Sequence, residues 1–183
     1  MADTDTKEAP PTDPRDRASI LVVDDEARIR MGCKAVLTKE GYEVTLAENG
    51  IKGLELIDSR HFDVALLDLM MPELSGFNVL ARVRDQHPDL VVIVITGYAT
   101  LEHSVESMKK GAFDFIPKPF TPDQLRVVVR KAIAHTRALQ DIATEQSRMR
   151  VLINQLSDGV LATDMHKQVA LCNPAFRRML LTD

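Results

Sequence analysis

Short apolar runs alternate along residues 18–120 with segments in which apolar residues recur every three or four positions. The short runs predict strands, mostly buried on both faces, at residues 20–23, 42–46, 64–68, 90–95 and 112–116. The periodic segments predict helices at residues 28–39, around 54–57, around 79–83 and at 101–110. Strands and helices that alternate in this way predict an α/β fold with a doubly wound parallel sheet and helices on both faces.

The pattern changes after residue 120. Apolar residues then recur at spacings that alternate between three and four, which predicts one long helix at residues 121–156 that continues as a dimeric coiled coil. We expect the dimer to form through residues 139–156. A single solvated helix is the alternative, because some positions of this heptad seam are weak. The seam consists of Leu125, Val128, Ala132, His135, Leu139, Ile142, Gln146, Met149, Ile153 and Leu156.

The two ends of the chain differ from the middle. Residues 1–17 are polar and carry three prolines, so we expect a disordered leader. Residues 157–183 predict two strands, 160–163 and 168–172, and a helix that follows Asn173 and Pro174. One hairpin and one helix cannot bury a core, so we expect the sequence to be cut inside a second domain of α+β type.

Composition excludes several classes of function. The formal net charge of −4 gives no bulk electrostatic case for nucleic-acid binding by this chain. No apolar run approaches the length of a membrane span, so we expect no membrane contact. Cys33 and Cys172 each lie in a mostly apolar segment, which favours two buried free thiols in a reducing cytoplasm.

Polar side chains follow four of the predicted strands. Asp24 and Asp25 follow the first strand, Asp68 ends the third, Thr96 the fourth, and Lys118 follows the fifth. The carboxyl ends of parallel strands meet at one edge of a sheet, so these side chains should converge. Alone, each has an ordinary structural reading as a helix cap, a strand-end hydroxyl or a solvated loop lysine.

Together, these side chains suggest phosphoryl transfer. Three carboxylates repel one another unless a cation neutralises them, and purely oxygen ligands favour Mg²⁺. One carboxylate can then attack phosphorus as a nucleophile, while Lys118 and Thr96 supply a charge and a hydroxyl for phosphoryl oxygens.

Residues 20–25, 64–72, 96–99 and 111–120 resemble the receiver domain of bacterial two-component response regulators. All of that family's motifs occur in their usual order, and the resemblance covers roughly residues 18–139. It implies a flavodoxin-like sheet of order 2-1-3-4-5, with the receiver domain at residues 18–120. It also implies that Asp68 accepts a phosphoryl group from a cognate histidine kinase or phosphotransfer protein in the cytoplasm.

The same resemblance implies the site residues. Asp24, Asp25, Asp68 and the Met70 carbonyl would hold Mg²⁺. Thr96 and Lys118 would contact the phosphoryl group, and Phe115 would be the aromatic that moves with Thr96. Many members have tyrosine where Phe115 stands, and the bond between Lys118 and Pro119 is commonly cis. Such a domain catalyses only its own phosphorylation and dephosphorylation, so whether the chain counts as an enzyme stays open.

Residues 158–176 are similar to the opening of a PAS sensory domain, through Asp158, Gly159, Val160 and the run 173–176. A receiver, a helix and a PAS domain most often precede a histidine kinase or another output. The resemblance therefore implies a relay from Asp68 through the Thr96 and Phe115 switch and the dimeric helix to a PAS or output region.

Two other functions remain open at this point. The first is a magnesium-dependent phosphatase with Asp68 as nucleophile, but such enzymes usually place an aspartate where Met70 stands. The second is a constitutive dimerisation or sensing module, against which the complete set of polar strand-end residues argues.

Overall fold

The computed structural model describes residues 17–97 and 101–181. Most of the expected leader, and Tyr98 and Ala99 of the 96–99 motif, lie outside these residues. The chain divides into two compact units, Met1–Thr136 and Arg137–Asp183, and each is described separately.

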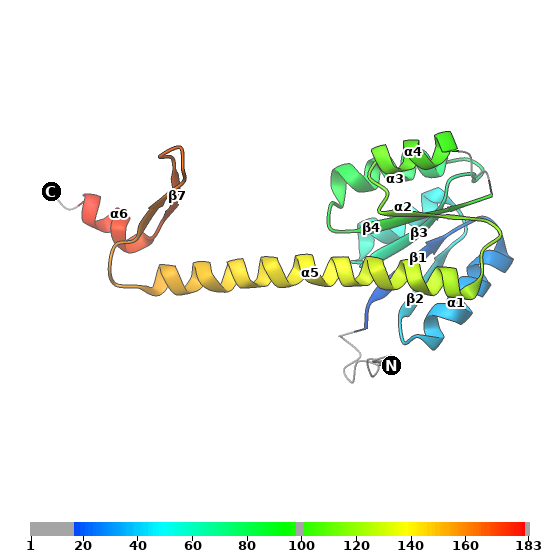
Figure 1. The fold of residues 1–183 in the computed structure, drawn as a ribbon, viewed down its shortest axis with the longest axis horizontal. Helices are drawn as coiled ribbons and strands as arrows, with labels where there is room; N and C mark the ends of the chain where they lie inside the picture. Colours follow the sequence, from blue (N-terminus) through cyan, green and yellow to red (C-terminus); the bar gives the residue numbers. More distant parts are fainter. Residues whose placement is uncertain (1–16, 98–100, 182–183) are drawn as a thin grey trace, which may run out of the picture. The chain divides into compact units, whose positions relative to one another are not determined.

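A five-stranded parallel sheet forms the centre of the first unit, in the order β2-β1-β3-β4-β5 (Figure 1). This confirms the predicted doubly wound sheet and its strand order. The elements are β1 (Ser19–Val23), α1 (Ala27–Lys39), β2 (Glu43–Ala47), α2 (Gly50–Ser59), β3 (Val64–Asp68), α3 (Gly76–Gln86), β4 (Val91–Thr96), α4 (Leu101–Lys109), β5 (Asp114–Pro117) and α5 (Pro122–Gln155).

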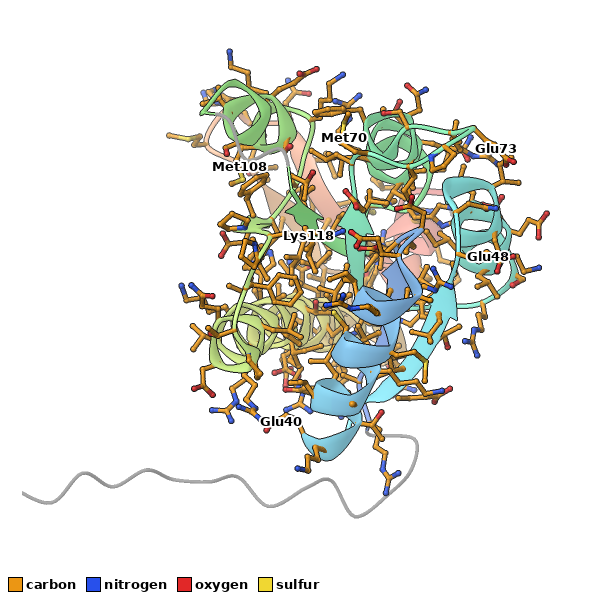
Figure 2. All side chains as sticks on the ribbon, turned by 90° about the vertical axis from the view of Figure 1, so that its right-hand side faces the viewer. Glu40, Glu48, Met70, Glu73, Met108 and Lys118 are labelled. Atoms are coloured by element: carbon orange, nitrogen blue, oxygen red, sulfur yellow. The ribbon has the colours of Figure 1, made fainter. Side chains whose placement is uncertain are left out.

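Two hydrophobic cores lie on opposite faces of this sheet. Alternate residues of each strand point to opposite faces, so Leu66 belongs to one core and Leu67 to the other. Helices α1 and α5 cover the Leu66 face, and α2 and α3 cover the Leu67 face (Figure 2). Every residue of β3 is buried, as the unbroken apolar run predicted.

The first turns of α5 belong to the first unit. Leu125, Val129, Ala132 and Ile133 are buried in the core on the α1 face. Glu40, at the C-terminal end of α1, accepts hydrogen bonds from the Arg126 and Arg130 guanidinium groups at 3.1 and 2.8 Å. Ion pairs therefore reinforce the apolar contact between α1 and α5.

The second unit contains the rest of α5, the antiparallel strands β6 (Leu161–Thr163) and β7 (Val169–Cys172), and α6 (Pro174–Leu181). Asn173 is fully buried and holds this unit together. Its Oδ1 accepts from the amides of Val160 and Phe176, and its Nδ2 donates to the carbonyls of Ile153 and Asp158. One side-chain amide thus uses its full hydrogen-bonding capacity to join the end of α5 to β6 and α6.

Both cysteines are free thiols. Cys33 is buried as expected, and burial raises the pKa of its thiol to about 12. Cys172 is only partly buried, so the expectation of two buried thiols is wrong for this residue. The reason is that the hairpin to which it belongs leaves most of its side chains exposed.

Candidate functional site

The carboxyl edge of the sheet brings the polar strand-end residues together. Val23 pairs with Leu67, so Asp24 stands level with Asp68 on the neighbouring strand. Thr96 pairs with Pro117, and the next residue along the chain is Lys118. In Figure 2, Lys118 lies near the middle of this edge, with Met70 and Glu48 farther out.

Three carboxylates converge at this edge. One ligand oxygen from each of Asp24, Asp25 and Asp68 lies within 4.8 Å of the others. Asp24 and Asp68 are buried, whereas Asp25 is exposed. The convergence that the sequence predicted for these three residues is therefore present.

Lys118 provides the positive charge at the site. Its Nζ lies 2.7 Å from Asp68 Oδ2, 2.8 Å from Asp24 Oδ2 and 3.0 Å from Glu26 Oε1. The carboxylates of Asp24, Asp25, Asp68 and Glu26, counted as ionised, outnumber the single Lys118 ammonium by three negative charges, so the site favours a divalent cation, and hard oxygen donors suit Mg²⁺. The residues present therefore fit a magnesium ion.

Burial and hydrogen bonding shift two pKa values at this site. Burial raises the pKa of Asp24, and hydrogen bonds from Lys118 and the Glu26 amide offset only part of this effect. Burial alone would lower the pKa of Lys118, but its hydrogen bonds to Asp24, Asp68 and Glu26 raise it above its ordinary value. Lys118 is therefore a permanent cation at this edge.

Backbone contacts hold the acidic residues in place. Arg30 of α1 donates from Nη1 to the carbonyl oxygens of Asp24 and Asp25, at 2.6 and 2.8 Å. The Met70 amide donates to Asp68 Oδ1 at 3.0 Å. A Cβ on Gly76 would lie 2.0 Å from the Asp68 carbonyl oxygen, so only glycine fits there.

Sequence reasoning assigned no role to Glu26, Arg30 or Gly76. Two signals for them existed in the sequence. Glu26 extends the acidic run after the first strand, and Gly76 precedes the third predicted helix. Neither signal predicts which atoms Glu26 and Gly76 contact in the folded chain.

Thr96 and Phe115 lie on the same face of the sheet. Phe115 pairs with Val94, and Val94 and Thr96 are two residues apart on β4, so all three point to one side. Thr96 is fully buried, and Phe115 is partly buried against the core of the α2 and α3 face. The bond between Lys118 and Pro119 is cis, as expected.

Comparison with known proteins identifies the family. A family model described as "Response regulator receiver domain" matches residues 20–130. The chain therefore belongs to the response-regulator receiver family. Proteins of this family take part in two-component systems, interact with histidine kinases or phosphotransfer proteins, and generally bind Mg²⁺.

Similar curated proteins are transcriptional regulators. The chain is 33% identical over 153 residues to the transcriptional regulatory protein ZraR of Klebsiella oxytoca, covering 78% of this chain and 34% of that protein. It is 37% identical over 124 residues to the DNA-binding transcriptional regulator NtrC of Escherichia coli K12, covering 68% and 26%. The chain thus spans about a third or less of these relatives.

Solved structures of receivers are also similar. A CheY-like receiver domain protein from Methanospirillum hungatei is 34% identical with a TM-score of 0.64, covering 67% of this chain and 98% of that one. NtrX from Brucella abortus, solved with ADP, is 30% identical with a TM-score of 0.68, covering 81% of this chain and 32% of that one.

Within residues 17–97 and 101–181, no helix is long and apolar enough to cross a membrane.

Proposed function

We propose that this chain is the phosphoacceptor module of a two-component phosphorelay and that Asp68 is its phosphorylation site. The main support is the position of Asp68, which is buried at the carboxyl edge of the sheet. Its carboxylate lies close to those of Asp24 and Asp25 and is 2.7 Å from the Lys118 ammonium. A nucleophilic carboxylate beside a cation-binding group and a fixed positive charge is the arrangement that phosphoryl transfer requires.

The chemistry needs one bond exchange. An Oδ atom of Asp68 forms a bond to phosphorus while the bond from phosphorus to the donor histidine breaks, and that imidazole leaves with the bonding electron pair. Asp24, Asp25, Asp68 and the Met70 carbonyl would hold Mg²⁺, which screens charge between carboxylate and phosphoryl oxygens when bound. Lys118 donates hydrogen bonds to the phosphoryl group, and the Arg30 contacts keep the Asp24 and Asp25 backbone in place.

The direct test is labelling with acetyl phosphate in the presence of Mg²⁺. We expect Asp68→Asn to abolish labelling while leaving the fold intact, because an amide keeps the shape but is not a nucleophile. Asp85→Asn is the matched control, since Asp85 is an exposed carboxylate on α3 that pairs with its neighbour Arg84. Full labelling of Asp68→Asn would disprove the assignment, and steady turnover of phosphate esters by the wild-type chain would favour a phosphatase instead.

The common face of Thr96 and Phe115 supports a switch that these two residues make together. Thr96 moves toward the phosphoryl group, and Phe115 on the same face follows into the space that Thr96 leaves. Thr96→Ala should therefore still be phosphorylated but should bind its partners as the unphosphorylated form does. Partner affinity equal to that of the phosphorylated wild-type chain would contradict this coupling.

The distal part of α5 forms a parallel coiled coil with a second copy. Leu139, Ile142 and Met149 continue the heptad spacing of Leu125 and Ala132, the two seam residues that are buried in the first turns, yet they are 50, 57 and 63% exposed in the single chain. In a parallel pair the same apolar positions of the two helices lie at the same heights and can pack against each other. For this reason the proposed partner of α5 is a second copy of the chain. Residues 158–176, which are similar to a stretch of PAS domains, receive the conformational change that the helix pair relays from phosphorylated Asp68.

The dimer is tested by light scattering on the full chain. We expect a dimer that Ile142→Lys weakens strongly, because the seam would have to bury a charge. Thr144→Lys, on the outer face of the same helix, should leave the dimer intact. A wild-type chain that is monomeric at high concentration would contradict the coiled coil. Ile142→Lys and Thr144→Lys variants that weaken the dimer equally would also contradict it.

A further inference from the structure

Two opposite charges flank the heptad seam in the distal part of α5. With Leu139 and Ile142 as consecutive core positions (a and d of the heptad), Glu145 occupies position g and Arg150 position e. Both residues lie inside α5, which is continuous to Gln155, so the heptad spacing holds through this stretch. In a coiled coil these two positions lie beside the partner helix, where opposite charges attract.

Glu145 and Arg150 make no strong contact within their own helix. The Glu145 side chain is 74% exposed, and its pair with Arg148 is long, at 3.7 Å between Oε1 and Nη1. An exposed pair of this kind contributes little. Arg150 is exposed, and no acidic residue lies three or four positions from it along the chain. Both charges are therefore available to a second helix.

The placement of these two charges fits a parallel partner in register. In such a pair, Glu145 of each helix lies beside Arg150 of the other, and twofold symmetry forms this contact twice. A shift by one heptad would place Glu145 beside Ala143, or beyond the end of α5 at Ser157. In an antiparallel pair, g positions face g positions and e positions face e positions, so Glu145 would not meet Arg150.

Gln146 favours the same register. It is a polar residue in an otherwise apolar part of the seam, at an a position. In a parallel pair in register the two Gln146 amides face each other and can form a hydrogen bond. A shift by one heptad would instead bury each amide against Leu139 or Ile153, where it finds no partner. The polar core position and the flanking charges thus select one arrangement.

We propose that ion pairs between Glu145 of one helix and Arg150 of the other make α5 select a second copy of this chain, parallel and in register. The apolar seam supplies most of the affinity. The charges supply orientation and partner choice, because a helix with other residues at these two positions lacks both contacts. This inference rests on the coiled coil proposed above and names the residues that set its orientation.

The first test exchanges charges in the full chain and follows dissociation of the dimer by light scattering on dilution. Glu145→Arg and Arg150→Glu each replace two attractive contacts by two repulsive ones, so each should weaken the dimer roughly tenfold. The variant with both substitutions regains two attractive contacts and should dissociate as the wild-type chain does. Arg148→Glu makes the same charge change on the outer face of α5 and should stay within about twofold of the wild-type chain.

A mixture of the two single variants tests orientation directly. The parallel heterodimer of Glu145→Arg with Arg150→Glu has two attractive contacts, whereas each homodimer has two repulsive ones. Native mass spectrometry resolves the three dimers, and the heterodimer should make up about nine-tenths of them in an equal mixture, rather than the roughly one half of random pairing. Glu145→Arg mixed with Arg148→Glu is the control and should pair at random.

Rescue by the double variant, together with an excess of the heterodimer, supports the proposal. Single variants as tight as the wild-type chain, a double variant no tighter than the single ones, or random pairing in the mixture would overturn it and leave the coiled coil standing. A monomeric wild-type chain, or a dimer insensitive to Ile142→Lys, would instead refute the coiled coil itself. Circular dichroism of each variant verifies that α5 stays helical.

Discussion

Replacement of Gly76 by alanine tests how tightly the Asp68 loop packs on the start of α3. A Cβ there would lie 2.0 Å from the Asp68 carbonyl oxygen and 2.7 Å from Leu69 Cα, whereas contacts below 3.0 Å essentially do not occur. The two segments would have to separate by about 1 Å, because both obstructing atoms belong to the backbone and cannot rotate away. The same separation would stretch the hydrogen bond from the Gly76 amide to the Leu69 carbonyl, now 3.0 Å.

We expect this overpacking to cost about 2–3 kcal/mol, the upper part of the usual range. With an m-value of ~2 kcal/mol/M, the urea midpoint followed by circular dichroism should fall by about 1 M or somewhat more. Labelling of Asp68 should fall as well, since the displaced atom is its own carbonyl oxygen.

Gly32→Ala is the matched control, and we expect it to change the free energy of unfolding in the opposite direction. Gly32 lies inside α1, and a Cβ there would meet no described heavy atom within 4 Å. Alanine should therefore stabilise the helix by about 0.5–1 kcal/mol. An unchanged urea midpoint in Gly76→Ala, measured beside a stabilised Gly32→Ala, would refute the close approach at Asp68.

Two further predictions concern stability. The hydrogen bond from Arg130, together with the charge of Arg126, lowers the pKa of Glu40. The ion pairs of Glu40 therefore stabilise the folded chain above the ordinary pKa of a glutamate, and this stabilisation is lost as the pH falls through the lowered pKa. Glu40→Gln should therefore lower the free energy of unfolding by about 0.5–1 kcal/mol in urea unfolding at about pH 7, and by progressively less as the pH falls through the lowered pKa of Glu40. A loss that does not shrink in acid would contradict the ion pairs. Asn173→Ala removes all four hydrogen bonds of a buried amide and should destabilise the second unit by about 2–4 kcal/mol, measured as faster amide hydrogen exchange in β6, β7 and α6. Exchange that is unchanged in these elements would show that the amide is dispensable.

The sequence alone was enough to predict the parallel sheet and the convergence of the polar residues at the ends of its strands. Apolar runs separated by helical periods require a parallel sheet, and the carboxyl ends of its strands share one edge. Asp24, Asp68 and Lys118 had to meet there, whatever their exact side-chain conformations. The burial of Leu125 and Ala132 in the first turns of α5 likewise follows from periodicity, because an apolar stripe must be covered. The periodicity was wrong for His135, which is exposed while its neighbour Thr136 is buried.

Contacts that depend on single atoms were decided only by the tertiary structure. Lys118 and Glu26 are 92 residues apart, and their contact depends on how β5 and the start of α1 are placed at one edge. The same holds for the Arg30 contacts to two backbone carbonyls and for the 2.0 Å approach at Gly76. Hydrophobic pattern specifies which face of an element is buried, but hydrogen bonds and steric limits depend on displacements of about 1 Å, which only the packed chain determines.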